Sequence, residues 1–298
     1  MGNVRMRQSY QESAGSASTT RSLLLYFILV FALLIPFLAL GAVTGSEILP
    51  GLPIAALSAI CPAVAAVIVV YRERKAAGVV KLLRRAIDFK RIRAKVWYLP
   101  ILLLMPLVMT ISFGALRLAG EPVPVPQFAL LPTLLLCVLF FIGGMGEELG
   151  WSGYATDPLQ ARWGALGASL ALGLIWAVYH YAALIEEHHS AMWIAWWSLG
   201  TVAARVIIVW LYNNTGRSVV AATLFHMTIN VTWQLFPVQG SYYDPRVTGI
   251  ITALVAVIVV VIWGPRTLTR NRDTGASRSA MRPLSASIGL RGDHRINW

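Results

Sequence analysis

Charged side chains are scarce in this sequence. Of its 298 residues, 13% are Asp, Glu, Lys or Arg, whereas 57% are hydrophobic. A typical globular protein carries about 25% charged residues, so this chain has about half of the charge needed to cover a water-soluble surface. The composition therefore excludes an ordinary soluble domain and indicates an exterior that faces lipid.

Cysteine is scarce as well. The two cysteines, Cys61 and Cys137, both lie within apolar runs. Because disulfide frameworks and zinc ribbons are recognised by several regularly spaced cysteines, we expect neither. The sequence also lacks the His-Glu-x-x-His signature of a helical zinc protease site.

Apolar stretches long enough to cross a bilayer recur along the chain. A helix needs roughly 20 predominantly apolar residues to span about 30 Å of hydrocarbon, and the runs lack the alternation expected of β-barrel strands. We therefore predict an all-α fold, a polytopic membrane bundle of about eight transmembrane helices. They are expected near residues 22–43, 51–71, 97–118, 128–149, 163–185, 192–212, 219–236 and 247–263.

The remaining charge is mainly positive, with a formal net charge of +12. Basic residues gather in segment 1–21, in connection 72–95 and after residue 264. Because cytoplasmic segments collect Lys and Arg, we expect an integral protein of the plasma (inner) membrane with both termini in the cytoplasm. We also expect contact with membrane lipids and no nucleic acid, and we predict an amphipathic surface helix at 84–95. The oligomeric state stays open.

Three predicted spans carry polar side chains that are costly in a membrane. They are Glu147 and Glu148 in the fourth span, His180 in the fifth, and His226 with Asn230 in the seventh. An ionisable group costs at least about 2.5–3.5 kcal/mol at the centre of a span, so each one is a candidate functional residue.

The spacing of these residues suggests a shared chemistry. His226 and Asn230 lie one helical turn apart and share a face, whereas Glu147 and Glu148 point about 100° apart. We therefore expect at most one glutamate to face the point that His226 and Asn230 share. A carboxylate beside an imidazole can take a proton from water, and a histidine with an amide can stabilise an oxyanion. Such a set suffices for amide hydrolysis.

Other interpretations of the same residues stay open. Glu147 can be a carboxylate at the end of a span, and the histidines and Asn230 can be hydrogen-bonded contacts between helices. A transporter or proton-coupled carrier would use the same groups as a proton relay. A catalytically silent immunity or scaffold protein is a third class.

At these residues the sequence resembles the CAAX-protease and bacteriocin-processing family of intramembrane endopeptidases. The family motifs are a glutamate pair, three further residues and an arginine; an aromatic residue four positions before histidine; and histidine four positions before asparagine or aspartate. Here they correspond to Glu147-Glu148, to Trp176 with His180, and to His226 with Asn230.

The resemblance implies a role for each of these positions. It implies Glu147 as the base that activates water, His180 as its partner, His226 and Asn230 as oxyanion stabilisers, and a lipidated or membrane-associated peptide as substrate. It also places a family-like core at about 128–236 within a transmembrane domain at 22–264. Flanking this domain we predict a polar cytoplasmic tail at 1–21 and a disordered basic tail at 265–298.

One position departs from the family pattern. The family arginine would fall at position 152, where this chain has Ser152. Either Arg205 or Arg162 could replace it beside Glu148, or Glu148 could be protonated, or the enzyme could be weak or inactive. A zinc ion held by glutamate and the two histidines is a further alternative, and we leave the cofactor open.

Overall fold

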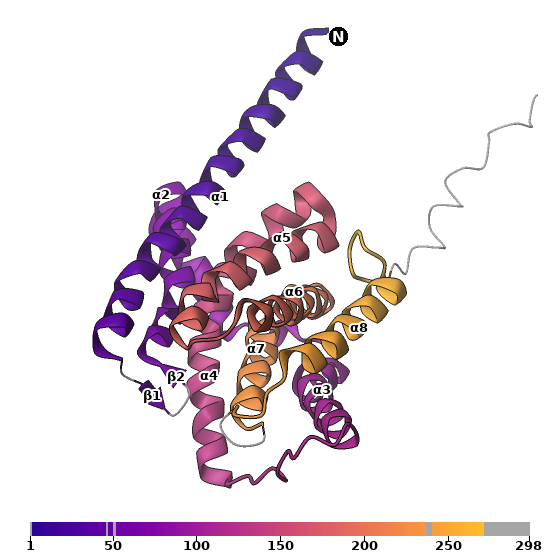
Figure 1. Cartoon of the computed structure of the whole chain (residues 1–298). Coiled ribbons are helices and arrows are strands. Elements are labelled where there is room, and N and C mark those ends of the chain that lie inside the picture. The colour runs from indigo at the N-terminus through magenta and orange to yellow at the C-terminus, as the bar shows by residue number, and fades with distance from the viewer. Residues whose placement is uncertain (1, 46, 50–51, 237–239, 271–298) are drawn as a thin grey trace, which may run out of the picture.

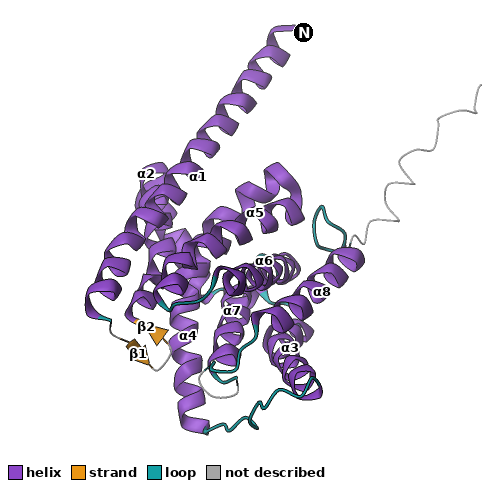
Figure 2. Cartoon of the chain, viewed as in Figure 1, coloured by secondary structure: helices purple, strands orange, loops and turns teal. Residues whose placement is uncertain are grey.

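The protein is almost entirely helical. The computed structural model describes residues 2–45, 47–49, 52–236 and 240–270. These residues form one bundle (Figure 1) of eight α-helices: α1 (Gly2–Thr44), α2 (Cys61–Leu83), α3 (Tyr98–Leu118), α4 (Leu130–Gly150), α5 (Thr156–Glu186), α6 (Ala191–Asn214), α7 (Val219–Gln234) and α8 (Pro245–Trp263). Two very short strands, β1 (Glu47–Leu49) and β2 (Leu52–Pro53), pair antiparallel beyond the end of α1 (Figure 2). The predicted all-α class is confirmed.

Each of the eight predicted spans overlaps a helix of the described chain. By length and composition, 6 helical segments of the described chain could cross a membrane. This number is smaller than eight for two reasons. The fourth and fifth predicted spans belong to one continuous helical segment, Leu130–Glu186, in which the π-helical turn Trp151–Ala155 joins α4 to α5. In addition, α7 has only 16 residues.

Helix α6 forms the centre of the bundle. It packs against α5, α7 and α8, and its residues 203–212 are all buried. A helix that is apolar on every side is stable only where other helices surround it. The position of α6 matters for the site because it brings Arg205, which is fully buried, to the middle of the bundle.

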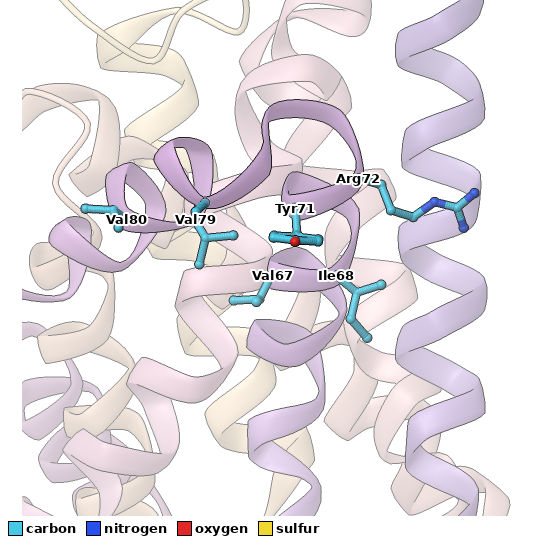
Figure 3. A pocket seen from close by; sticks show the side chains of 7 residues that line it. Val67, Ile68, Tyr71, Arg72, Val79 and Val80 are labelled. Carbon is cyan, nitrogen blue, oxygen red and sulfur yellow. The ribbon is translucent and has the colours of Figure 1, made fainter.

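Helix α2 bends sharply at Lys75, where the backbone has φ 54° and ψ −159°. Val67, Ile68 and Tyr71 before the bend and Val79 and Val80 after it line a groove with a volume of about 440 Å³ (Figure 3). The bend separates the membrane-crossing part of α2 from the basic connection that follows.

That connection is not the amphipathic surface helix predicted at 84–95. It contains short 3-10 turns, Arg84–Ile87 and Phe89–Arg91, and it is bonded to the end of the bundle. Arg85 donates hydrogen bonds to the carbonyl oxygens of Gly153 (2.6 Å) and Arg217 (2.9 Å). The prediction was wrong because a guanidinium with several donors found carbonyl partners on two other segments.

Asp88 in the same connection holds the start of α7. Its carboxylate accepts hydrogen bonds from the backbone N–H groups of Val219 (3.1 Å) and Val220 (3.2 Å), and from the hydroxyl of Ser218 (2.6 Å). A carboxylate is favourable at a helix N-terminus because it satisfies free N–H groups and faces the positive end of the helix dipole. Asp88 therefore helps to position the helix that carries His226 and Asn230.

The chain after α8 returns to the bundle. Gly164, with φ +70°, makes a bend inside α5 that glycine adopts without strain. Beyond the bend, the backbone N–H groups of Ala165 and Leu166 donate to Arg266 (2.8 Å) and Pro265 (2.9 Å), and the nearby Leu268 is fully buried. The predicted disordered tail therefore does not begin at residue 265, and its remainder, 271–298, lies outside the described residues.

Candidate active site

A mainly apolar cavity of about 820 Å³ lies within the bundle. Its walls come from all eight α-helices of the described chain and from the 3-10 turn Ile54–Ile60. Four of the predicted site residues, Glu147, His180, His226 and Asn230, line this one cavity. The structure therefore brings together the polar groups of three separate family motifs, while their catalytic roles stay predictions.

Close helix packing places Glu147 at the cavity wall. The preceding residue, Gly146, lies against the turn Ile54–Ile60, where a Cβ atom would be 2.7 Å from the carbonyl oxygen of Ala59. Any larger residue would push α4 away from this turn, because real Cβ atoms do not approach that closely. The glycine-rich sequence before the glutamates thus sets their depth in the bundle.

Glu147 is held by two tryptophans. The residue is 5% exposed, and its Oε2 accepts hydrogen bonds from the indole Nε1 of Trp151 (3.0 Å) and of Trp176 (2.7 Å). Its Oε1 lies 3.9 Å from Nε2 of His226. The two carboxylate oxygens thus have different surroundings, since the indoles bond only Oε2.

Glu148 is sealed inside the bundle. It is 0% exposed, and Nη1 of Arg205 lies 3.0 Å from each of its oxygens. Nδ1 of His226 is 3.0 Å from Oε1, and the hydroxyl of Ser152 donates to Oε2. A buried charge is tolerated only when it is paired and hydrogen-bonded, and Glu148 meets both conditions.

Arg205 replaces the arginine that position 152 lacks. Of the two candidates, Arg205 on α6 pairs with Glu148, whereas Arg162 donates to the hydroxyl of Thr20. Ser152 lies beside Glu148 and donates a hydrogen bond to its carboxylate. The buried glutamate therefore has its counter-charge from a different helix.

His226 lies between the two glutamates. Its Nδ1 faces Glu148 and its Nε2 faces Glu147. Of the two glutamates, Glu147 lines the cavity that His226 and Asn230 share, and Glu148 does not. The imidazole contacts both carboxylates because it has nitrogen atoms on two sides.

His180 lines the cavity without a direct contact to Glu147 among the described hydrogen bonds and ion pairs. Its Nδ1 lies 2.9 Å from the backbone carbonyl oxygen of Trp176. Because a carbonyl accepts only, Nδ1 carries the proton of this bond, and in the neutral ring Nε2 is left as an acceptor. His226, and not His180, is the imidazole that the described contacts place beside Glu147.

The described residues contain no group of three or more His, Cys, Asp or Glu side chains arranged to hold a metal. At Glu147, Oε2 receives two N–H groups, so of its two oxygens only Oε1 is without an indole donor.

The outer rim of the cavity carries a second acidic group. Glu187 lines the cavity, and burial, together with the nearby Glu47 and Glu186 carboxylates, raises the pKa of Glu187 to about 7. Nε2 of His189 lies 3.3 Å from Glu187, and its ring stacks on Trp193 at a centroid distance of 3.7 Å.

Trp151 is a site residue that the sequence did not reveal. It is fully buried, and its indole N–H bonds Glu147. A signal was present, because Trp151 follows Glu147 by four residues and a buried indole N–H usually finds an acceptor.

Comparisons with known proteins agree with the motifs. Residues 128–232 match the family described as type II CAAX prenyl endopeptidase, Rce1-like. The chain is also 26% identical over 190 residues to CAAX prenyl protease 2 of Methanococcus maripaludis, a match that covers 59% of this chain and 67% of that protein. Both matches confirm the family resemblance and the expectation of a membrane protease.

Proposed function

We propose that this chain, which shares the Rce1-like protease domain over residues 128–232, hydrolyses a peptide bond of a lipidated or membrane-associated substrate with a water molecule activated by Glu147. The observation that carries the proposal is the position of Glu147. Its Oε2 is fixed by indoles, while the residue lines a mainly apolar cavity together with His180, His226 and Asn230.

In this mechanism Glu147 acts as the general base. A carboxylate that lines a cavity can accept a proton from water as that water attacks a carbonyl carbon. The attack forms a tetrahedral oxyanion, and the proton taken by Glu147 then passes to the leaving nitrogen as the C–N bond breaks. His180, whose Nε2 accepts in the neutral ring, helps to orient the water.

His226 and Asn230 stabilise the oxyanion. When its ring is doubly protonated, His226 donates Nδ1–H to Glu148 and presents Nε2–H on the side of Glu147. Asn230 lies one turn further along α7 and lines the same cavity. Fixed donors of this kind supply a large part of the rate acceleration in acyl transfer. The pair Arg205–Glu148 fixes the His226 ring.

The cavity wall supports an apolar substrate group. The residues that line it are mainly aliphatic and aromatic, among them Leu34, Phe37, Leu139, Ile142 and Trp197. Such a lining suits a lipid chain, because burial of apolar surface is the main source of affinity in cavities of this kind. A prenyl group is the lipid named for the related protease.

The orientation in the membrane extends the proposal. The basic connection 84–95 is bonded to the start of α7 through Asp88, and basic connections face the cytoplasm. Cleavage therefore takes place toward the cytoplasmic side of the plasma (inner) membrane, with both termini on that side.

The test is the cleavage of a quenched fluorescent farnesylated peptide by purified protein in proteoliposomes. Wild type is compared with Glu147→Gln and with Glu121→Gln, which alters an exposed loop carboxylate. Activity in wild type and Glu121→Gln, and its loss in Glu147→Gln, is the expected result. Full activity of Glu147→Gln would overturn the mechanism.

Two further arms sharpen the result. A peptide of the same sequence without the farnesyl group tests the substrate class, and equal cleavage of both peptides would contradict the proposed lipid. A chelator such as 1,10-phenanthroline tests the protein-group mechanism, which predicts unchanged activity. If the chelator abolishes activity and added zinc restores it, the reaction requires a metal and the protein-group mechanism is overturned.

A further inference from the structure

The two tryptophans that bond Glu147 come from different helical segments. Trp151 begins the π-helical turn after α4, and Trp176 lies in α5. Both indole N–H groups end on the same atom, Oε2, at 3.0 and 2.7 Å. Hydrogen bonds to a charged acceptor in a buried site are stronger than those between neutral groups. The two bonds to Oε2 therefore hold the carboxylate in a single orientation.

The asymmetry separates the two oxygens of Glu147. With Oε2 held by two donors, Oε1 is the oxygen that lies toward His226. A general base works only when the accepting atom is within hydrogen-bond reach of the water it deprotonates. A carboxylate free to rotate would spend part of its time in other orientations.

Trp176 also contacts the partner of the other glutamate. The guanidinium of Arg205 lies 4.2 Å from the centroid of the Trp176 ring, which is a cation–π geometry. The His226 ring meets Trp176 edge-on at 5.0 Å. One side chain therefore touches Glu147 through its N–H and Arg205 through its ring, which links the catalytic carboxylate to the sealed ion pair.

We propose that Trp151 and Trp176 are positioning residues that hold Oε2 of Glu147 through their indole N–H groups and so leave Oε1 as the oxygen that accepts the proton from water. This inference rests on the proposed function of Glu147. It assigns the indole N–H groups a role that the aromatic rings alone cannot perform.

The test removes the N–H groups and keeps the rings. Trp151→Phe and Trp176→Phe are each expected to lower kcat by about tenfold to a hundredfold with little change in KM. The acid limb of the kcat/KM profile is expected to move to higher pH, because the ionised carboxylate loses a donor. Both shifts should be larger in the double variant.

A matched control is available in the same bundle. Trp210 is buried, but its Nε1 has no hydrogen-bond partner among the described residues. Trp210→Phe deletes a buried indole N–H that has no acceptor among the described residues. This substitution should therefore leave kcat and the pH profile unchanged.

The pH profile also depends on the other ionisable groups around Glu147. These groups come from six helices, and all of them are retained in the Phe variants: Tyr26, Cys61, Glu148, Tyr179, His180, Arg205 and His226. A shift that appears in the Trp151 and Trp176 variants and not in Trp210→Phe therefore reports the lost N–H donors.

The outcomes separate this inference from the proposed function. If Glu147→Gln is inactive while both Phe variants match wild type, the inference is overturned and the function stands. If Glu147→Gln is active, both fail. Should a Phe variant not fold, incorporation of 3-benzothienylalanine at the same position replaces the N–H by sulfur in a ring of nearly equal shape, and full activity of that protein would equally overturn the inference.

Discussion

The inner and outer ends of the cavity are built from the same residue types. At the inner end, Glu147 lies beside His226 and Trp176. At the outer end, Glu187 lies beside His189, which stacks on Trp193. The two ends differ in the groups that surround each glutamate. Two indoles bond Glu147 and an arginine neutralises the adjacent Glu148, whereas Glu187 faces the carboxylates of Glu47 and Glu186.

This difference shows how its surroundings decide what a glutamate can do. At the inner end, donors hold the carboxylate in one orientation, which suits a base with a fixed task. At the outer end, burial and like charges act against ionisation of Glu187. The first arrangement is suited to catalysis, and the second makes the stability of the fold depend on pH.

Glu147 and Glu187 are expected to differ in their effect on activity. Glu147→Gln is expected to lower kcat/KM by roughly 100-fold to 10,000-fold, because the general base is lost. Glu187→Gln keeps the shape of the rim and is expected to change kcat/KM less than about threefold. Initial rates of farnesyl-peptide cleavage measure both, and a comparable loss in Glu187→Gln would place chemistry at the outer end.

The positive charge that pairs with Glu148 can be removed by substitution of Arg205. Arg205→Met leaves Glu148 buried without its counter-charge and is expected to cost about 3–5 kcal/mol of stability. Thermal unfolding in detergent measures the loss, and Arg162→Met, on an exposed arginine, is the control. The double variant Arg205→Met/Glu148→Gln should recover a large part of the stability. An unchanged melting temperature in Arg205→Met would show that the ion pair contributes little.

Removal of the Ser152 hydroxyl, which also bonds Glu148, is expected to lower stability by a smaller amount. Ser152→Ala removes one hydrogen bond to Glu148 while Arg205 and His226 remain, so a loss of about 1–2 kcal/mol is expected. Ser169→Ala is a suitable control, because that buried hydroxyl bonds only to a backbone carbonyl in its own helix. Equal melting temperatures for the two variants would argue against a specific role of Ser152.

The outer end predicts a modest pH dependence of stability. The pKa of Glu187 rises from 4.5 to about 7 in the folded protein, so its favourable contribution is complete below pH 4.5 and is lost as the pH rises to about 7. The pKa of His189 is lowered by burial, which acts in the opposite direction. The melting temperature of Glu187→Gln should therefore decline less than that of wild type over this range. Parallel curves would contradict the assignment.

A large part of the fold was predictable from the sequence. Apolar runs of membrane-spanning length identify helices, because each helix satisfies its own backbone hydrogen bonds. The motif residues were predictable as well, since polar groups inside such runs are too costly to be incidental. Their gathering around one cavity follows the order of the spans and the spacing of His226 and Asn230.

The partners of these residues were not predictable. The pair Arg205–Glu148 depends on where α6 crosses α4, and no local pattern in either helix encodes that crossing. The same holds for Arg85, whose partners lie 68 and 132 residues away in sequence. Tertiary packing also buries Trp151.

The bond from Asp88 to the start of α7 has a practical consequence for studies of topology. The connection that contains Asp88 is the most basic one between spans, and it is the natural target for charge reversal, tag insertion or protease mapping. Because Asp88 also holds the helix that carries His226 and Asn230, an alteration there would disturb the active site even in a correctly inserted protein. Loss of activity after such an alteration is therefore no evidence of inverted insertion.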